Sequence, residues 1–143
     1  MLNGISKILT GDVLKALCDM GHGDELVLAD ANFPGQSVAD ANGAVFVRLP
    51  GIPVSEVLEA IMPLFPLDDT THPAYVMDLT DADKAAGMEE PPAWADFRRL
   101  TGQEMGLIER FAFYERAKKA AVIIQTGEER KFGNLLLVKG CVL

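Results

Sequence analysis

Cysteine is scarce in this sequence, and no long apolar run is present. The two cysteines, Cys18 and Cys141, show no zinc-site spacing, so we expect them to be reduced thiols buried in a cytoplasmic protein. No apolar stretch approaches the length of a membrane span. The first seven residues also lack the charged-then-apolar layout of a signal peptide. We therefore expect a cytoplasmic protein with no membrane partner.

Basic residues and nucleotide- or metal-binding motifs are also lacking. The chain has 13 Lys and Arg against 21 Asp and Glu, which gives a net charge of −8. Nucleic-acid backbones and anionic membranes favour basic patches, so we expect neither as a partner. No P-loop, dinucleotide fingerprint, zinc spacing or Ser-His-Asp order is visible. We expect no metal and no cofactor, and chemistry that acid–base side chains can perform alone.

Helical and strand patterns alternate along the 143 residues, of which 49% are hydrophobic. This length and composition predict one domain, residues 1–143. Strands are predicted at residues 25–30, 44–49, 74–79, 107–108, 120–125 and 135–138, and helices at 10–20, 54–65, 94–101 and 111–118. Residues 31–37 are expected to form a loop, and residues 80–92 a flexible polar segment. The alternation indicates an α/β fold with helices on both faces of a sheet.

Polar side chains lie at both ends of the first predicted strand. His22 occupies a glycine-flanked turn before it, and Asp30 follows it. Histidine exchanges protons near neutral pH, and ligands of open α/β sheets gather beyond the carboxyl ends of strands. Because five strand residues span about 16 Å, the two side chains meet only if the turn folds back or if a neighbouring subunit or substrate bridges them. Structural alternatives are a helix C-cap for His22 and a loop cap for Asp30.

Three further polar side chains could contact a ligand. Arg110 could donate to a sugar hydroxyl or a carboxylate, or it could pair on the surface with Glu109 or Asp96. Tyr114 could offer its phenol to a ligand, or it could be a half-buried packing residue. Asn134 could recognise a hydroxyl or only form a turn. The second histidine of the chain, at position 72, lies in a polar loop and is expected to be solvated.

Six stretches, in order along the chain, closely resemble the RbsD/FucU family. They are residues 20–25 (MGHGDE), 30–34 (DANFP), 61–65 (IMPLF), 110–117 (RFAFYERA), 126–128 (TGE) and 133–134 (GN). The first and fourth stretches are specific, whereas the TGE turn alone is a weak signal. Residues 80–103 match poorly. The FucU branch, the L-fucose mutarotases, is the nearer one.

The resemblance implies a fold, an assembly and an activity. It implies a three-layer αβα domain with a mostly parallel or mixed sheet, and a ring-like oligomer, usually a decamer, with pockets between neighbouring subunits. It implies that the chain interconverts the α and β anomers of L-fucose, or of a closely related monosaccharide, without a cofactor. His22 then becomes the acid–base residue and Asp30 its partner or a sugar ligand. Arg110, Tyr114 and Asn134 become sugar-binding residues.

One position departs from the family pattern. The family often has tyrosine where this chain has Phe132. The turn that contains Phe132 is therefore expected to offer the sugar an apolar ring face without a hydroxyl donor, which affects substrate preference or rate.

Two other functions are compatible with the same residues. One is a ribose-type pyranase, which interconverts pyranose and furanose rings as the RbsD branch does. The other is a non-catalytic monosaccharide-binding accessory protein of sugar uptake. An enzyme accelerates anomer exchange, whereas a binding protein does not. The two enzymes differ in which NMR signals of the sugar exchange: those of the two anomers for a mutarotase, and those of the pyranose and furanose rings for a pyranase.

Overall fold

A single mixed sheet runs through the computed structural model, which describes residues 1–143. Its strands are β1 (Glu25–Ala29), β2 (Val45–Leu49), β3 (Ala74–Met77), β4 (Gly106–Ile108), β5 (Val122–Thr126) and β6 (Leu135–Val138). Their order across the sheet is β2-β5-β1-β6-β3-β4. The last strand, β6, runs antiparallel to both β1 and β3, whereas the other neighbouring strands pair in parallel. The predicted mixed sheet is confirmed.

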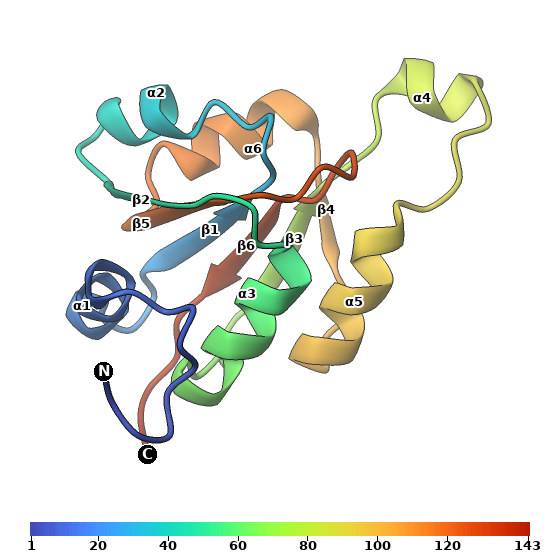
Figure 1. Cartoon of the computed structure of the whole chain (residues 1–143). Coiled ribbons are helices and arrows are strands. Elements are labelled where there is room, and N and C mark those ends of the chain that lie inside the picture. Colours follow the sequence, from blue (N-terminus) through green and yellow to red (C-terminus); the bar gives the residue numbers. More distant parts are fainter.

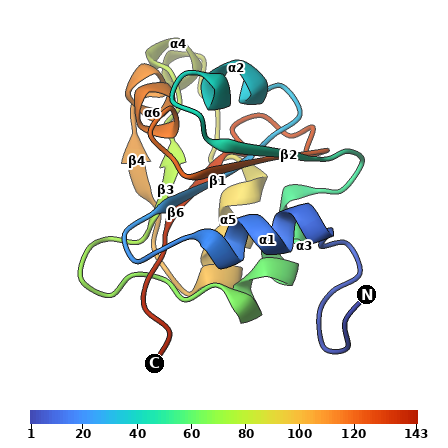
Figure 2. The same cartoon turned by 90° about the vertical axis from the view of Figure 1, so that its left-hand side faces the viewer.

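Helices cover both faces of this sheet (Figures 1 and 2). They are α1 (Gly11–Asp19), α2 (Gly35–Asp40), α3 (Val54–Ile61), the short 3₁₀ helix η1 (Met62–Leu64), α4 (Asp81–Ala85), α5 (Pro92–Thr101) and α6 (Arg110–Ala117). Helices α1, α3 and α5 lie on one face, and α2 and α6 lie on the other. The three-layer αβα architecture is therefore confirmed.

The central strand β1 is buried on both faces, which explains its apolar sequence. Leu26 and Leu28 point into the core beneath α1, α3 and α5, while Val27 and Ala29 point into the core beneath α2 and α6. All four side chains are fully buried. A strand that is covered on both faces has a continuous apolar sequence. The residues that precede β1 and those that follow it lie at opposite ends of this strand.

Local signals set the start of α1 and the end of α3. The Thr10 side chain caps α1 by accepting a hydrogen bond from the backbone N–H of Val13, at 3.3 Å. The long helix predicted over residues 54–65 ends as an α-helix at Ile61, and Pro63 lies in η1. Proline lacks the N–H that a continuing α-helix requires, so it ends the regular helix here.

Two segments predicted to be irregular contain short helices. Helix α2 begins at Gly35, within the expected loop 31–37, and its six residues are too few to show a helical period. Helix α4 lies within the expected flexible segment 80–92. It carries a capping box in which Thr80 and Asp83 satisfy each other's backbone N–H groups. This helix buries no side chain, so its sequence has no apolar stripe that would predict a helix.

The cysteine prediction is half wrong. Cys18 and Cys141 are both free, as expected, but both are exposed rather than buried. Cys18 lies on the solvent side of α1, next to the buried Leu17.

No helix of the structure has the length and apolar character that crossing a membrane requires.

Candidate active site

A hollow of about 380 Å³ lies beyond the carboxyl ends of β1 and β3, beside the start of β6. Nine residues line it: Asp30, Asn32, Phe33, Met77, Arg110, Tyr114, Lys131, Phe132 and Asn134. Five of the six side chains singled out from the sequence are among them, and His22 is the exception. The position agrees with the rule that ligands of open α/β sheets gather at the carboxyl ends of strands. We call this hollow the β1–β6 pocket.

Asp30 and Asn134 form the polar floor of the β1–β6 pocket. Because β1 and β6 are antiparallel neighbours, with Leu28 opposite Leu135, the residue after β1 meets the residue before β6. The Asp30 backbone N–H donates to Asn134 Oδ1 at 2.8 Å, and Asn134 Nδ2 donates back to Asp30 Oδ2 at 3.0 Å. The carboxylate also accepts the backbone N–H of Asn32 at 3.0 Å, so Asp30 does cap its loop.

Burial determines the acid–base character of Asp30. Its side chain is buried against the sheet end, and desolvation raises the pKa of the carboxyl above its usual value. Hydrogen bonds from the backbone of Asn32 and Phe33, and from Asn134, oppose part of that shift. Asp30 thus retains a proton at a higher pH than an ordinary surface aspartate does.

Arg110 and Tyr114 form one wall from the first turns of α6. The Tyr114 ring packs against Phe33 with 5.5 Å between ring centroids, and the Arg110 guanidinium carbon lies 5.9 Å from the Tyr114 centroid. The surface ion pair considered for Arg110 is absent, because Asp96 pairs instead with Arg130 and Glu109 caps the N-terminus of α6. Arg110 is exposed and free to donate into the pocket.

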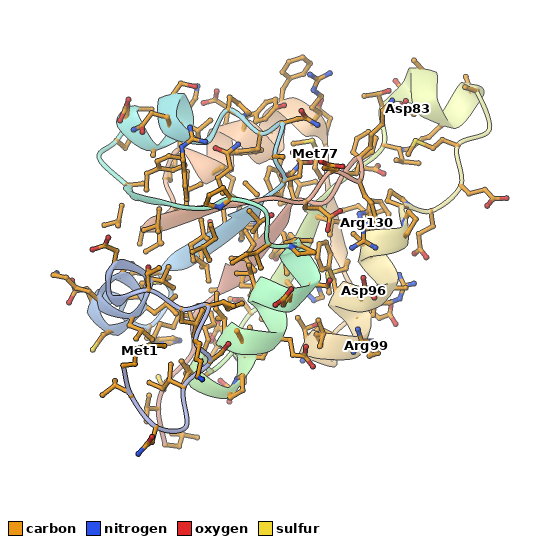
Figure 3. The ribbon with its side chains drawn as sticks, in the orientation of Figure 1. Met1, Met77, Asp83, Asp96, Arg99 and Arg130 are labelled. Atoms are coloured by element: carbon orange, nitrogen blue, oxygen red, sulfur yellow. The ribbon has the colours of Figure 1, made fainter.

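An ion pair between the buried Glu128 and the partly exposed Arg130 supports the opposite wall, which residues 128–134 form. The Glu128 carboxylate accepts hydrogen bonds from the Arg130 backbone at 2.9 Å and from its Nε at 2.8 Å, and these bonds lower the pKa of Glu128. Arg130 also reaches Asp96 of α5, and Figure 3 labels both residues. A Cβ at Gly133 would lie 2.7 Å from Glu128 Cγ, so only glycine allows this approach.

Phe132 projects from this wall in a rarely used backbone conformation. Its φ angle is +60°, the only positive φ outside glycine in the chain. Its carbonyl accepts a hydrogen bond from Trp94 Nε1 at 3.1 Å, and its ring is half-buried between the two cores. Left-handed backbone at a bulky residue persists only where surrounding contacts hold it, and such residues cluster at functional sites.

His22 lies at the other end of β1, away from the β1–β6 pocket. Its Nε2 atom is 3.0 Å from Oδ1 of Asp68, and its side chain is 48% exposed. The turn does not fold back over the strand end, so that route to Asp30 is excluded. The helix C-cap alternative is also wrong, because Met20 caps α1 and the imidazole bonds to a carboxylate.

Two residues of interest were not predicted from the sequence: Asp68, which pairs with His22, and Met77, which lines the pocket. Asp68 lies in a polar loop after η1, and nothing in its local pattern distinguishes it from Asp69. Met77 is the last residue of β3, and its apolar sequence context suggests a core residue. The pairing of β3 with β6 places it in the pocket with Asn134 and Phe132. The exposed His72 contacts Tyr75 edge-on, as a solvated loop residue can.

Cationic side chains rim the β1–β6 pocket on the side of α4. Lys131 and Arg110 both lie near Asp83, and their charges contribute to lowering the pKa of its carboxyl. The largest cause of that shift is the hydrogen bond from Thr80. The α4 segment projects from the body of the molecule next to this rim, with Asp83 on its inner side (Figures 1 and 3).

Comparisons with known proteins match nearly the whole chain. Residues 3–142 match the model of the RbsD / FucU transport protein family. The fucose mutarotase of Danio rerio is 47% identical over 99% of this chain and 95% of its own length. The crystal structure of the fucose mutarotase of Streptococcus pneumoniae in complex with L-fucose is 36% identical, with a TM-score of 0.88 over 99% of this chain and 100% of that one. FucU from Bifidobacterium longum is 40% identical, with a TM-score of 0.90 over 98% and 99% of the two chains.

Proposed function

The chain belongs to the RbsD / FucU transport protein family, and we propose that it is a fucose mutarotase. It is then an isomerase that interconverts the α and β anomers of L-fucose. The observation that carries this proposal is the full-length similarity to fucose mutarotases, one of them solved with L-fucose. The β1–β6 pocket supports it, since apolar rings and hydrogen-bonding side chains together suit a monosaccharide.

Anomer exchange needs only proton transfers. A base takes the proton of the anomeric hydroxyl, the bond between C1 and the ring oxygen breaks, and an acid gives the ring oxygen a proton. The open-chain aldehyde then rotates about C1–C2 and closes on its other face, and the two protons return to their donors. A well-placed acid–base pair accelerates such a step by about 10²–10⁴-fold.

We assign these roles to named side chains. His22 exchanges a proton with the anomeric hydroxyl, and Asp30, whose pKa burial raises, exchanges one with the ring oxygen. Arg110 and Asn134 donate hydrogen bonds to sugar hydroxyls, while Tyr114 and Phe132 contact the apolar face of the sugar ring. Asn134 already bonds to Asp30 in the folded chain, which holds both groups in place before a sugar binds.

The separation of His22 from Asp30 leads us to propose a site shared between subunits. The two side chains lie at opposite ends of β1, so a neighbouring copy supplies His22 to each β1–β6 pocket. We propose a ring-like homo-oligomer, a decamer, of single-domain subunits spanning residues 1–143. Large exposed apolar side chains on both edge strands support association: Val45 on β2 is 47% exposed and Leu107 on β4 is 58% exposed. The two free cysteines suit the reducing cytoplasm.

The proposed function is tested by exchange NMR on L-fucose. The rate at which the α and β anomeric proton signals exchange is measured with and without the protein, in a buffer that catalyses exchange weakly. We expect a rate that increases in proportion to enzyme concentration. Exchange on L-fucose equal to the buffer rate, with saturation transfer from protein to sugar, would instead identify a binding protein. Faster pyranose–furanose exchange of D-ribose, with no effect on L-fucose, would identify a pyranase.

Phe132 offers a substitution that should increase activity. Phe132→Tyr places a hydroxyl at the pocket wall without changing the backbone, and this hydroxyl can donate to the ring oxygen or to O1. A neutral hydrogen bond contributes about 0.5–1.5 kcal/mol, so we expect the exchange rate on L-fucose to increase by up to roughly tenfold. The measurement is the same NMR exchange rate, on L-fucose, D-ribose and D-galactose.

The matched control for this variant is Phe111→Tyr, which adds the same hydroxyl to a ring that is 68% exposed and does not line the pocket. It should leave all three rates unchanged. A fall in activity of Phe132→Tyr on the sugar that the wild type uses best would mean that an apolar group of the substrate occupies this position. No change on any sugar would place Phe132 outside the working pocket.

A further inference from the structure

Asp68 is the buried partner of the exposed His22. The Asp68 side chain is 3% exposed, whereas that of His22 is 48% exposed, and the Oδ1–Nε2 distance is 3.0 Å. Backbone pairing holds Asp68 in place, because its N–H donates to the Val138 carbonyl at 3.0 Å. The turn of His22 is anchored to the same segment, since the Gly23 N–H donates to the Lys139 carbonyl at 2.8 Å. The end of β6 thus fixes the relative position of the two side chains.

The hydrogen bonds of Asp68 favour an ionised carboxylate. Thr70 donates its backbone N–H to Oδ1 at 3.2 Å, and its hydroxyl lies 2.9 Å from the same oxygen. Thr71 donates its backbone N–H at 3.2 Å and its hydroxyl, both to Oδ2. The bonds from the Thr71 hydroxyl and from His22 lower the pKa of Asp68 far below its usual value. An ionised carboxylate accepts hydrogen bonds and donates none.

The acceptor character of Asp68 decides where the hydrogen of His22 resides. A neutral imidazole carries one N–H, and the nitrogen that faces a carboxylate has to be the donor. We propose that Asp68 is a positioning residue that holds His22 in its Nε2–H tautomer and so assigns proton exchange with the sugar to Nδ1. The role of the sugar in this inference rests on the proposed function, whereas the tautomer of His22 does not.

The proton transfers balance in this arrangement. Nδ1 takes the proton of the anomeric hydroxyl as the C1–ring oxygen bond breaks, and His22 becomes an imidazolium whose Nε2–H still faces the Asp68 carboxylate. The ring oxygen receives its proton from the Asp30 carboxyl, and reclosure returns both protons. A fixed carboxylate behind an imidazole orients the ring and stabilises its charged form without itself being protonated.

The test exploits the fact that the chain has only two histidines, His22 and His72. Long-range ¹H–¹⁵N correlation spectra of the imidazoles at alkaline pH report which nitrogen carries hydrogen, and His72→Gln assigns the signals. We expect His22 of the wild type to be Nε2–H. In Asp68→Asn, whose amide can donate as well as accept, we expect a mixed or Nδ1–H population. The kcat for L-fucose should fall by about 10- to 100-fold, with KM changed less than twofold.

Two variants complete the design. Asp69→Asn makes the same change in charge at an exposed neighbour that forms no side-chain hydrogen bond, and it should alter neither the tautomer nor kcat. Asp68→Glu restores a carboxylate and should recover the Nε2–H tautomer with part of the lost kcat. An Nδ1–H tautomer in the wild type would overturn the inference without any variant being needed. An unchanged tautomer in folded Asp68→Asn would do so as well. If the wild type does not exchange L-fucose anomers, the proposed function fails, while the tautomer is still read from the spectra.

Discussion

His22→Gln is expected to lower the enzyme-catalysed exchange of L-fucose anomers by about 10²–10⁴-fold, which is the contribution of a placed acid–base group. Glutamine can still donate a hydrogen bond to the buried Asp68 carboxylate, so that group keeps a partner. It cannot take up or release a proton at neutral pH. Because the side chain of His22 is half exposed, its replacement leaves no cavity, and the fold should persist.

The control for His22→Gln is the same substitution at His72. That side chain is exposed, lies against Tyr75 outside the β1–β6 pocket, and forms no hydrogen bond to Asp68. Its replacement should leave the NMR exchange rate unchanged. Circular dichroism establishes that both variants are folded. A wild-type exchange rate in His22→Gln would remove histidine from the mechanism and direct attention to Asp30 alone.

A mixture of two inactive variants is expected to regain activity. His22→Gln and Asp30→Asn each damage one half of the proposed site, and the structure places the two halves at opposite ends of β1. If neighbouring subunits supply them, random mixed oligomers with equal amounts of the two variants contain about a quarter of intact sites. The exchange rate on L-fucose should therefore rise from near the buffer rate to about a quarter of the wild-type rate.

Mixed oligomers of wild type and the double variant His22→Gln, Asp30→Asn provide the matched control. A shared site again gives about a quarter of the wild-type rate, whereas a site within one chain gives about half. Light scattering verifies that the mixed particles are large oligomers. Absence of recovery in verified mixtures of the single variants would mean that one chain supplies both residues. A monomeric mass at micromolar concentration would exclude the shared site.

Two helices and the cysteines show where local sequence signals fail. Helix α4 has a good N-terminal signal, the capping box of Thr80 and Asp83, but no apolar stripe to mark it as a helix that packs. Helix α2 is shorter than two turns, so periodicity carries little information. Cys18 shows that a residue within a helical pattern can face solvent, since the buried stripe of α1 passes through Val13, Ala16 and Leu17 instead.

The sequence by itself determined the strands, the longer helices and most of the side chains of the candidate site. The apolar runs predicted all six strands, the helical patterns predicted α1, α3, α5 and α6, and the motifs around residues 20–25 and 110–117 indicated the family. Asp30, Arg110, Tyr114, Phe132 and Asn134, all chosen from the sequence, line one pocket. These signals are local, because hydrophobic period, capping and turn chemistry depend on residues a few positions apart.

Only the tertiary structure decided which of these side chains meet. Asp30 and Asn134 are 104 residues apart in sequence, and they bond because β6 inserts antiparallel between β1 and β3. The same insertion carries the other end of β6 past the turn of His22 and places Asp68, 46 residues further along the chain, against the imidazole. Strand order depends on how both faces of the sheet are covered, which no local period encodes. The long-range packing of β6 therefore separated His22 from Asp30 within one chain and gave each a different partner.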